Sequence, residues 1–467
     1  MKTLSELLSS IEILETVGET SLEISSICFD SRLAEKKSVF VAFKGTETDG
    51  HVFIDNALEH GATAVVYEKE VPNKLPGIAY IRVRDSHAAL AELAQNFYDH
   101  PSRKLKLIGV TGTNGKTTTA TLLFKLFEGL GHKSALLSTI ENKISDETFS
   151  ATHTTPDPTA IASFLQEAVR RGCKYAFMEC SSHAIDQKRI TGLEFTGVIF
   201  TNLTHDHLDY HKTMTAYAKS KKALFDSLPA NSFALANLDD KMSHYMLKDT
   251  PAHKYFFSLD SNADFNEIIE TKLIGKFNAY NALGIYATAV LLGVPADQVK
   301  LKLKELEAPA GRMELIESKT GVRGIVDYAH TPDALENVLK TLREVAGSET
   351  KVITVVGCGG DRDTTKRPIM ARIACGLSDQ VILTSDNPRS EDPEKILDDM
   401  VAGVPVGKNF EREPDRARAI AIAVKLSRPG DIVLLAGKGH EDYQILNGGK
   451  IHFSDREELK KISDKTT

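Results

Sequence analysis

The sequence contains no tryptophan, only five cysteines among 467 residues, and no long apolar run. So few cysteines exclude a disulfide-stapled secreted scaffold, and none of them forms the C-x-x-C pair typical of structural zinc sites. The ~20 consecutive apolar residues that a membrane-spanning helix needs are missing. The first residues also lack the basic and apolar segments of a signal peptide. We therefore expect a cytoplasmic protein with reduced thiols and no membrane span.

An excess of positive charge is missing as well. The chain has 57 Lys and Arg against 64 Asp and Glu, a net charge of −7, so we expect no nucleic-acid partner. An anionic substrate would then need locally concentrated cations. The content of 42% hydrophobic and 26% charged residues is typical of globular proteins. At ~150 residues per domain, the length predicts about three domains.

Strands alternate with helices along the chain, and this pattern predicts an α/β protein with mostly parallel sheets. We divide it into domains at residues 1–103, 104–310 and 311–467, with Pro101-Ser102-Arg103 as a linker. The strands expected in the second and third domains cover residues 105–110, 175–179, 197–201, 351–356, 380–384 and 431–436. The helices expected there cover residues 116–129, 159–170, 276–291, 331–345, 367–375, 393–402 and 414–426.

A glycine-bearing loop, Gly112-Thr113-Asn114-Gly115-Lys116-Thr117-Thr118, lies between an expected strand and an expected helix. In that context, backbone N–H groups and the helix N-terminus face a phosphate, Lys116 adds charge, and Thr117 offers a hydroxyl to Mg²⁺. The common P-loop spacing requires glycine at position 110, where this chain has Val110, so the loop is a variant. It predicts ATP as the ligand; the alternative is an ordinary strand–turn–helix junction.

Two further expected strands end in polar residues. Glu179 closes one, and His205, Asp206 and His207 follow the other. In a parallel sheet both ends would lie beside the phosphate loop, where Glu179 and His207 would complete a Mg²⁺ site with Thr117. Mg²⁺ prefers oxygen ligands, so a histidine ligand is unusual. Taken alone, the His-x-His pair could be a zinc pair, but a polar loop without a catalytic metal is the favoured interpretation. The lysines within residues 217–225 favour a solvated basic helix face.

Taken together, these motifs and several downstream ones resemble the Mur ligase family. The quoted stretches, in chain order, are Thr111 to Thr118, Thr154-Thr155-Pro156, Glu179 to His183, Thr204 to Asp209, Gly275 to Ala282, Gly311 to Glu314, Asp327 to Asp333, Gly357 to Asp363, Asp386 to Arg389 and Ala436 to Glu441. They run in order through most of the chain. As a set they are far more specific than any one of them.

The resemblance implies a small N-terminal domain that binds UDP, a central P-loop-type ATPase domain and a C-terminal Rossmann-like domain. It implies a monomeric ATP- and Mg²⁺-dependent ligase of peptidoglycan precursor synthesis that works through an acyl phosphate. The motifs are most similar to those of members that join meso-2,6-diaminopimelate to UDP-N-acetylmuramoyl-L-alanyl-D-glutamate. A carboxylate is a poor electrophile, so phosphorylation supplies the leaving group that amide formation needs.

The resemblance also implies roles for individual residues, in four groups. ATP would be bound by Gly112, Thr113, Asn114, Gly115, Lys116, Thr117, Thr118, Asn278, Asn281 and His330. Metal ligands and catalytic groups would be Thr117, Glu179, His207, Lys116, Arg312 and Lys221, the last matching a lysine that family members carbamylate. The UDP substrate would contact Phe29, Ser31, Thr46, Thr154, Thr155, Ser181, Gln187 and Arg189. Diaminopimelate would contact Arg362, Asp386, Asn387, Pro388, Arg389, Gly437 and Glu441.

Arg389 favours diaminopimelate over L-lysine, because only diaminopimelate carries a carboxylate at its far end for the guanidinium to pair with. Ligation of L-lysine stays open as an alternative. So does folylpolyglutamate synthetase, which would lack the first domain. Other classes that the loop alone allows are an ATP-driven switch or motor, which would need glycine at position 110, and a non-catalytic nucleotide-binding module.

Overall fold

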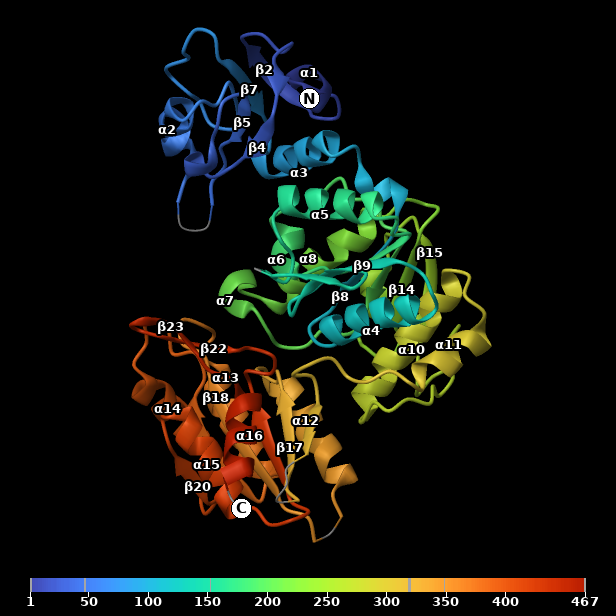
Figure 1. Cartoon of the computed structure of the whole chain (residues 1–467), viewed down its shortest axis with the longest axis vertical. Coiled ribbons are helices and arrows are strands. Elements are labelled where there is room, and N and C mark those ends of the chain that lie inside the picture. The colour runs from blue at the N-terminus through green and yellow to red at the C-terminus, as the bar shows by residue number, and fades with distance from the viewer. Residues whose placement is uncertain (1, 46–47, 152, 318–320, 348, 466–467) are drawn as a thin grey trace.

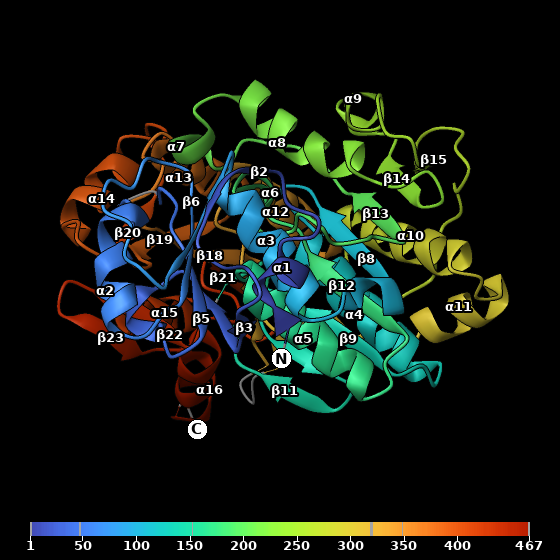
Figure 2. The ribbon, with the colours of Figure 1, turned by 90° about the horizontal axis from the view of Figure 1, so that it is seen from above.

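The structure is a computed structural model of the chain, and it describes residues 2–45, 48–151, 153–317, 321–347 and 349–465. The chain folds into three α/β domains, each built on its own sheet. Figure 1 shows them stacked along the long axis, with the first at the top, and Figure 2, taken from above, shows the blue first domain nearest the viewer. The predicted three-domain α/β fold is thus confirmed. The boundaries expected at residues 103 and 310 stay predictions.

The main sheet of the first domain has the strand order β2-β7-β6-β5-β4, in which β2 is antiparallel to β7 and the other neighbours are parallel. Strands β1 and β3 form a separate antiparallel pair. Apolar side chains of α1 and α3 cover one face, and those of α2 cover the other. Its elements are β1 (Lys2–Thr3), α1 (Leu4–Leu7), β2 (Ile13–Val17), β3 (Glu23–Ile24), β4 (Ser26–Cys28), η1 (Ser31–Leu33), β5 (Ser38–Val41), η2 (Gly50–Phe53), α2 (Ile54–Glu59), β6 (Ala64–Tyr67), β7 (Ala79–Val83) and α3 (Ser86–Phe97).

The predicted linker at Pro101-Ser102-Arg103 is instead part of a short 3₁₀ helix, η3 (Pro101–Lys104). Pro101 occupies its first turn, where a missing N–H costs nothing. Ser102 is buried, and its hydroxyl accepts a hydrogen bond from the Glu194 N–H at 3.1 Å. The segment is therefore packed against the central domain.

The central sheet runs β11-β10-β9-β12-β8-β13-β14-β15, and β9 to β15 in this order are parallel. Helices α5, α6 and α8 lie above it in Figure 1, and α4, α10 and α11 lie below. Its elements are β8 (Lys106–Thr111), α4 (Lys116–Gly129), β9 (Ser134–Leu137), β10 (Asn142–Ile144), β11 (Glu147–Phe149), α5 (Pro158–Arg170), β12 (Tyr175–Glu179), α6 (Ser182–Asp186), β13 (Gly197–Phe200), α7 (Leu208–His211), α8 (Met214–Asp226), β14 (Phe233–Asn237), α9 (Ser243–Met246), β15 (His253–Phe257), α10 (Lys276–Leu291) and α11 (Ala296–Leu303).

The third domain has the strand order β16-β17-β21-β18-β19-β20, with β16 antiparallel at the edge. Helices α12, α13 and α14 cover one face, and α15 and α16 cover the other. Its elements are β16 (Glu314–Glu317), β17 (Arg323–Asp327), α12 (Pro332–Val345), β18 (Val352–Cys358), α13 (Lys366–Leu377), β19 (Gln380–Ser385), α14 (Pro393–Val401), β20 (Phe410–Arg412), α15 (Arg416–Leu426), β21 (Ile432–Ala436), β22 (Tyr443–Leu446), β23 (Gly449–His452) and α16 (Asp455–Lys465).

The helices begin in two different ways. Asp157 caps α5, Thr331 caps α12 and Asp415 caps α15, each accepting backbone N–H hydrogen bonds through its side chain. Helices α4 and α10 begin instead after Gly115 and Gly275, both with positive φ and without a side-chain cap. Their first N–H groups can therefore serve an anionic ligand.

Candidate active site between the central and third domains

A cavity of about 550 Å³ lies between the central and third domains. Three neighbouring parallel strands, β12, β8 and β13, end at its floor, and the N-termini of α4 and α10 form part of its wall. The prediction that Glu179 and the His207 loop share the phosphate-loop edge is thus correct. Predicted nucleotide and catalytic residues that line the cavity are Thr113, Asn114, Gly115, Lys116, Thr117, Thr118, Asn278, Asn281, Arg312 and His330.

The two loop glycines are required by close contacts. Gly112 has φ +148°, and a Cβ there would lie 1.9 Å from the Thr201 hydroxyl. Gly115 has φ +84°, and a Cβ there would lie 2.5 Å from Oδ1 of Asn281. Asn281 in turn donates to Oδ1 of Asn278 at 3.2 Å. The loop is thereby pressed against α10, and only glycine fits at either position.

Lys116 lies within the loop at the first turn of α4. Its ammonium donates to the backbone oxygens of Gly112 at 2.9 Å and Thr113 at 2.8 Å. Burial lowers the pKa of this amine, and the carboxylates of Glu179 and Asp206 oppose that shift. The loop thus places a cation where a phosphate would sit on the α4 N-terminus.

Thr117 and Glu179 form a buried pair of oxygen donors. The Thr117 hydroxyl donates to Oε2 of Glu179 at 2.9 Å, and the Thr139 N–H donates to Oε1 at 2.7 Å. Arg312, from the third domain, donates to the same hydroxyl at 2.9 Å. A hydroxyl beside a carboxylate is a donor set that suits a hard cation such as Mg²⁺.

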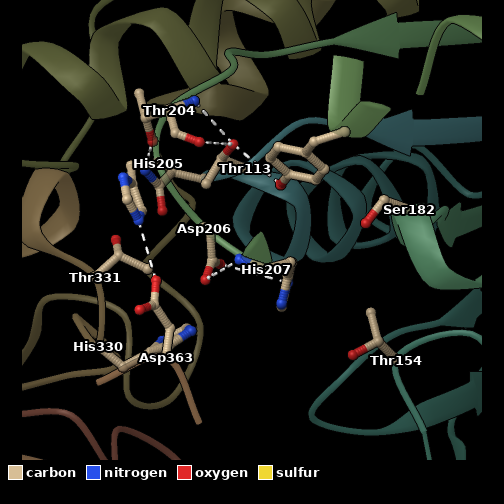
Figure 3. A network of polar contacts seen from close by, with 12 residues as sticks. Thr113, Thr154, Ser182, Thr204, His205, Asp206, His207, His330, Thr331 and Asp363 are labelled. Atoms are coloured by element: carbon tan, nitrogen blue, oxygen red, sulfur yellow. Dashed lines mark hydrogen bonds and ion pairs between the residues drawn. The ribbon is translucent and has the colours of Figure 1, made fainter. Parts of the chain in front are cut away.

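His207 lines the same cavity, and its Nε2 lies 3.4 Å from Oδ2 of Asp206 (Figure 3). The residue adopts a left-handed backbone conformation with φ 54° at the start of α7. Burial lowers the pKa of its imidazole, so the ring is neutral at pH 7. Within the described ranges, no three His, Cys, Asp or Glu side chains gather into a metal-binding group. Glu179 and His207 therefore line the cavity as separate donors.

The expectation of a solvated basic face on residues 217–225 is wrong. In α8, Lys219 is exposed but Lys221 is 1% exposed and Lys222 is 6% exposed. Lys222 is held by ion pairs to Asp226 and Asp249, both at 2.6 Å. This face of α8 packs onto the rest of the central domain, which buries the aliphatic stems of both lysines.

Lys221 reaches into the cavity from α8 and has a different environment. Its Nζ donates to the Gly112 oxygen at 2.8 Å and lies 4.6 Å from the centre of the Tyr217 ring. Burial and the neighbouring Lys116 hold the pKa of its amine well below the ordinary value. A neutral amine is the nucleophilic form of lysine.

The central and third domains meet around this cavity. Asn114 donates to Asp333 at 2.7 Å. His205 pairs with Asp363 at 3.0 Å, as Figure 3 shows. Nδ1 of His330 forms a hydrogen bond with the backbone oxygen of Tyr328 at 2.8 Å, which orients the imidazole ring. The phosphate loop is thus already in contact with third-domain residues.

The residues predicted to hold the sugar and peptide cluster near Glu179. The Thr139 hydroxyl donates to the Thr154 hydroxyl at 3.0 Å, and the Thr155 hydroxyl donates to the backbone oxygen of Glu179 at 2.8 Å. Arg189 donates to Oε1 of Gln187 and to the Thr155 oxygen, which ties this group together. Thr154 and Ser181 line the cavity itself.

The predicted uridine residues lie in the first domain. Phe29 is partly exposed, and its ring centre lies 5.9 Å from that of Phe43, which in turn lies 4.2 Å from His87. Ser31 is buried at the start of η1. Thr46 lies outside the described residues. Phe29 and Ser31 therefore lie in a different domain from the phosphate loop.

The residues predicted for diaminopimelate come together at the ends of β18, β19 and β21. The Arg389 guanidinium donates to the Gly360 oxygen at 2.6 Å, and a Cβ at Gly360 would meet the Pro388 oxygen. These contacts lock the loop bearing Arg362 onto the loop of residues 386–389. Gly437 has φ +116°, and a Cβ there would lie 3.2 Å from Oδ2 of Asp386.

Asn387 and Glu441 are hydrogen-bonded to each other in the same cluster of residues. Asn387 donates through Nδ2 to Oε2 of Glu441 at 2.8 Å. Burial and the nearby Asp386 raise the pKa of the Glu441 carboxyl. The group thus combines two arginines with two carboxylates.

Sequence reasoning missed two residues that hold this machinery. Thr139 supports Glu179 through its backbone N–H, which no side-chain pattern reveals. Lys438 is fully buried among Asp386, Asn387 and Glu441. The only sequence signal for Lys438 is its place between Gly437 and Glu441, in the stretch from Ala436 to Glu441 that resembles the Mur ligase family.

The chain is similar to known proteins in both sequence and structure. Family models match residues 23–98 (Mur ligase family, catalytic domain), 110–289 (Mur ligase middle domain) and 311–439 (Mur ligase, glutamate ligase domain). The chain belongs to the Mur ligase family. A relative from Cytophaga hutchinsonii, named UDP-N-acetylmuramoyl-L-alanyl-D-glutamate–2,6-diaminopimelate ligase, is 50% identical over 482 residues, covering 99% of each chain.

Solved structures agree with membership in the Mur ligase family. One titled as a UDP-N-acetylmuramoyl-L-alanyl-D-glutamate–2,6-diaminopimelate ligase has a TM-score of 0.70 and 32% identity, covering 100% of this chain and 99% of that one. A Mycobacterium tuberculosis folylpolyglutamate synthase has a TM-score of 0.60 and 16% identity, covering 74% of this chain and 91% of that one. The second likeness concerns the fold alone. Among the described residues, no helix is both long and apolar enough to cross a membrane.

Proposed function

We propose that the protein is an ATP-dependent ligase that joins meso-2,6-diaminopimelate to UDP-N-acetylmuramoyl-L-alanyl-D-glutamate in peptidoglycan precursor synthesis. The observation that carries this proposal is the 50% identity, over nearly the whole of both chains, to a ligase of that name. The paired arginines and carboxylates at the strand ends of the third domain support it, because diaminopimelate presents carboxylates and ammonium groups at both ends.

The reaction has two steps. The γ-phosphoryl group of ATP passes to the terminal carboxylate of the UDP substrate, giving an acyl phosphate and ADP. The amine of diaminopimelate then attacks the acyl carbon, the C–O bond to phosphate breaks, and an amide, a proton and inorganic phosphate result. The protein must therefore bind three reactants and exclude water from the acyl phosphate.

The phosphate loop and its partners would serve the first step. Gly112 to Thr118 would cradle the phosphates with backbone N–H groups, and Lys116 would leave its loop oxygens to pair with the transferring group. Asn278 and Asn281 would contact the nucleotide from α10. Arg312 and His330 would approach it from the third domain, where Arg312 already reaches Thr117.

Thr117, Glu179, His207 and a modified Lys221 would hold Mg²⁺, which when bound would offset the negative charge of the phosphates. The hydroxyl and carboxylate oxygens of Thr117 and Glu179 fit such an ion. The neutral amine of Lys221 would add to CO₂ and release a proton, giving a carbamate whose two oxygens suit the same ion. Burial favours this reaction because it lowers the pKa of the amine and so increases the share of its unprotonated form.

The substrates would meet at this cavity from the other domains. Phe29, Ser31 and Thr46 would bind uridine, and Thr154, Thr155, Ser181, Gln187 and Arg189 would bind the sugar and peptide. Arg362, residues 386–389, Gly437 and Glu441 would bind diaminopimelate. We also propose domain boundaries at 103/104 and 310/311, a monomer, and a location in the cytoplasm.

ADP release with single omissions tests this proposal. The purified chain should release ADP at steady state only when ATP, Mg²⁺, UDP-N-acetylmuramoyl-L-alanyl-D-glutamate (the UDP dipeptide) and diaminopimelate are all present. ADP release with a folate and glutamate in place of the last two would instead favour folylpolyglutamate synthetase. ADP release that needs neither substrate would contradict the ligase proposal and favour a switch or motor.

A further inference from the structure

Lys438 lies at the base of the proposed diaminopimelate pocket and has no exposed surface. Its Nζ donates to Oε2 of Glu441 at 3.0 Å and to Oδ1 of Asn387 at 3.2 Å, and lies 3.6 Å from Oδ1 of Asp386. A lysine is rarely buried so completely unless it is paired, and here three pocket residues surround it.

These contacts fix the orientation of the pocket side chains. Oδ1 of Asn387 accepts from Lys438 and from the Ile445 N–H at 2.9 Å, so its amide nitrogen must face Glu441. Glu441 thus receives one hydrogen bond from Asn387 and one from Lys438. Oδ1 of Asp386, in contrast, is buried and has no hydrogen-bond partner among the described residues. Because the Lys438 ammonium at 3.6 Å is too far for a hydrogen bond, this oxygen can still accept one from a ligand donor.

The charges around Lys438 define what that donor can be. Asp386 and Glu441 carry two negative charges, and Lys438 cancels one, so one negative charge is left to pair with one ammonium of the ligand. Arg362 and Arg389 remain available for substrate carboxylates. With these two arginines counted, the five side chains carry one net positive charge. Diaminopimelate has no net charge and L-lysine has one net positive charge, so diaminopimelate matches the site better.

We propose that Lys438 is a positioning residue that fixes Asn387 and Glu441 and sets the pocket charge, and thereby the preference for a diamino dicarboxylic acid over a diamino monocarboxylic acid. This inference rests on the proposed function. Lys438 acts through the pocket carboxylates, with its own ammonium buried behind them.

The test compares Lys438→Met with Lys450→Met as a matched control. The Nζ of Lys438 lies 5.6 Å from the centre of the Tyr443 ring. Lys450 approaches the same ring, with its Nζ 3.6 Å from the centre, but it is exposed on β23. Lys438→Met should raise the KM for diaminopimelate about tenfold and lower the ratio of kcat/KM for diaminopimelate to that for L-lysine about tenfold, because one charge near the pocket changes. Lys450→Met should keep both values.

The first half-reaction separates this role from general damage. Trapping of the acyl phosphate by hydroxylamine needs no amino acid, so it should stay within about twofold of wild type in Lys438→Met. An unchanged substrate ratio, or an equal fall in hydroxamate formation, would overturn the inference. Absence of hydroxamate in the wild type would instead refute the proposed function.

A charge-paired double variant decides the matter even if Lys438→Met is unstable. In the Glu441→Gln variant the positive charge of Lys438 cancels the negative charge of Asp386, so this variant should bind diaminopimelate weakly. Adding Lys438→Met to Glu441→Gln restores the single negative charge and should raise kcat/KM for diaminopimelate above that of Glu441→Gln. A double variant no better than Glu441→Gln would refute a charge-setting role.

Discussion

Replacement of Lys221 tests the most unusual side chain in the cavity. Lys221→Ala should abolish most turnover, because the proposed carbamate would be lost together with the amine. Groups that stabilise charge in a transition state are worth ~10²–10³-fold in rate, and we expect a loss of that size. Small carboxylates such as formate or acetate should restore part of the activity, because they can enter the space left by the side chain and supply the missing oxygens.

The structure also sets the effect on stability. Lys221→Ala removes three buried methylenes at ~0.8 kcal/mol each and leaves a cavity, so the variant should lose about 2–4 kcal/mol of unfolding free energy. Lys221→Met fills most of that space and should be nearly as stable as wild type. It should lose as much activity as Lys221→Ala, but carboxylates should not restore it, because the cavity is occupied.

The assay is steady-state ADP release with and without added formate, alongside urea unfolding of each variant. Lys219→Ala is the control, because Lys219 is exposed on the same helix and should change stability by less than about 0.5 kcal/mol. Lys222 is unsuitable as a control, since its ion pairs bury it. Equal losses in Lys219→Ala and Lys221→Ala, or full activity in Lys221→Met, would refute the reasoning.

Three further predictions follow from single residues. Lys116→Ala should fold normally but release ADP ~10²–10³-fold more slowly, since the transferring phosphoryl group loses its cation; a near-normal rate would remove the loop lysine from the mechanism. Arg389→Ala should lose most of the preference for diaminopimelate over L-lysine. Such a preference reaches ~10⁴-fold in a site built to bind a charged group. An unchanged ratio of kcat/KM for diaminopimelate to that for L-lysine would contradict this. Burial raises the pKa of the Asp327 carboxyl to about 6 from 3.8, so the native state holds this proton at higher pH than the unfolded state, and stability should fall as pH rises from about 4 to about 6. In Asp327→Asn the unfolding free energy should fall about 3 kcal/mol less between pH 4 and pH 7 than in the wild type, as measured by urea unfolding of both proteins at the two pH values. An equal pH dependence of the unfolding free energy in both proteins would show that Asp327 titrates normally.

Elements with strong local signals could be predicted from the sequence. Helices α4 and α10 and strand β12 span the predicted residues, because apolar periodicity and glycines mark their ends. The meeting of Glu179 with the phosphate loop was also predictable, since parallel strands bring their carboxyl ends to one edge. The nucleotide side of the site is therefore largely encoded in local patterns.

Contacts between distant segments could not be predicted in the same way. Arg312 reaches Thr117 across 195 residues, and only the packing of two domains brings them together. The burial of Lys222 depends on Asp249 from the turn after α9, which helical spacing cannot reveal. The role of Lys438 depends on Asn387, 51 residues away, and on short strands such as β22 that lack clear periodicity. Long-range burial, rather than residue type, decides these positions.

A competition experiment tests the central claim most directly. The wild-type protein is given ATP, Mg²⁺, the UDP dipeptide and equal concentrations of meso-diaminopimelate and L-lysine, and the product is identified by mass. The account predicts that nearly all product carries diaminopimelate, formed with one ADP per amide. A product that carries mainly L-lysine would contradict the assignment of the amino acid, and ADP without any amide product would contradict the ligase itself.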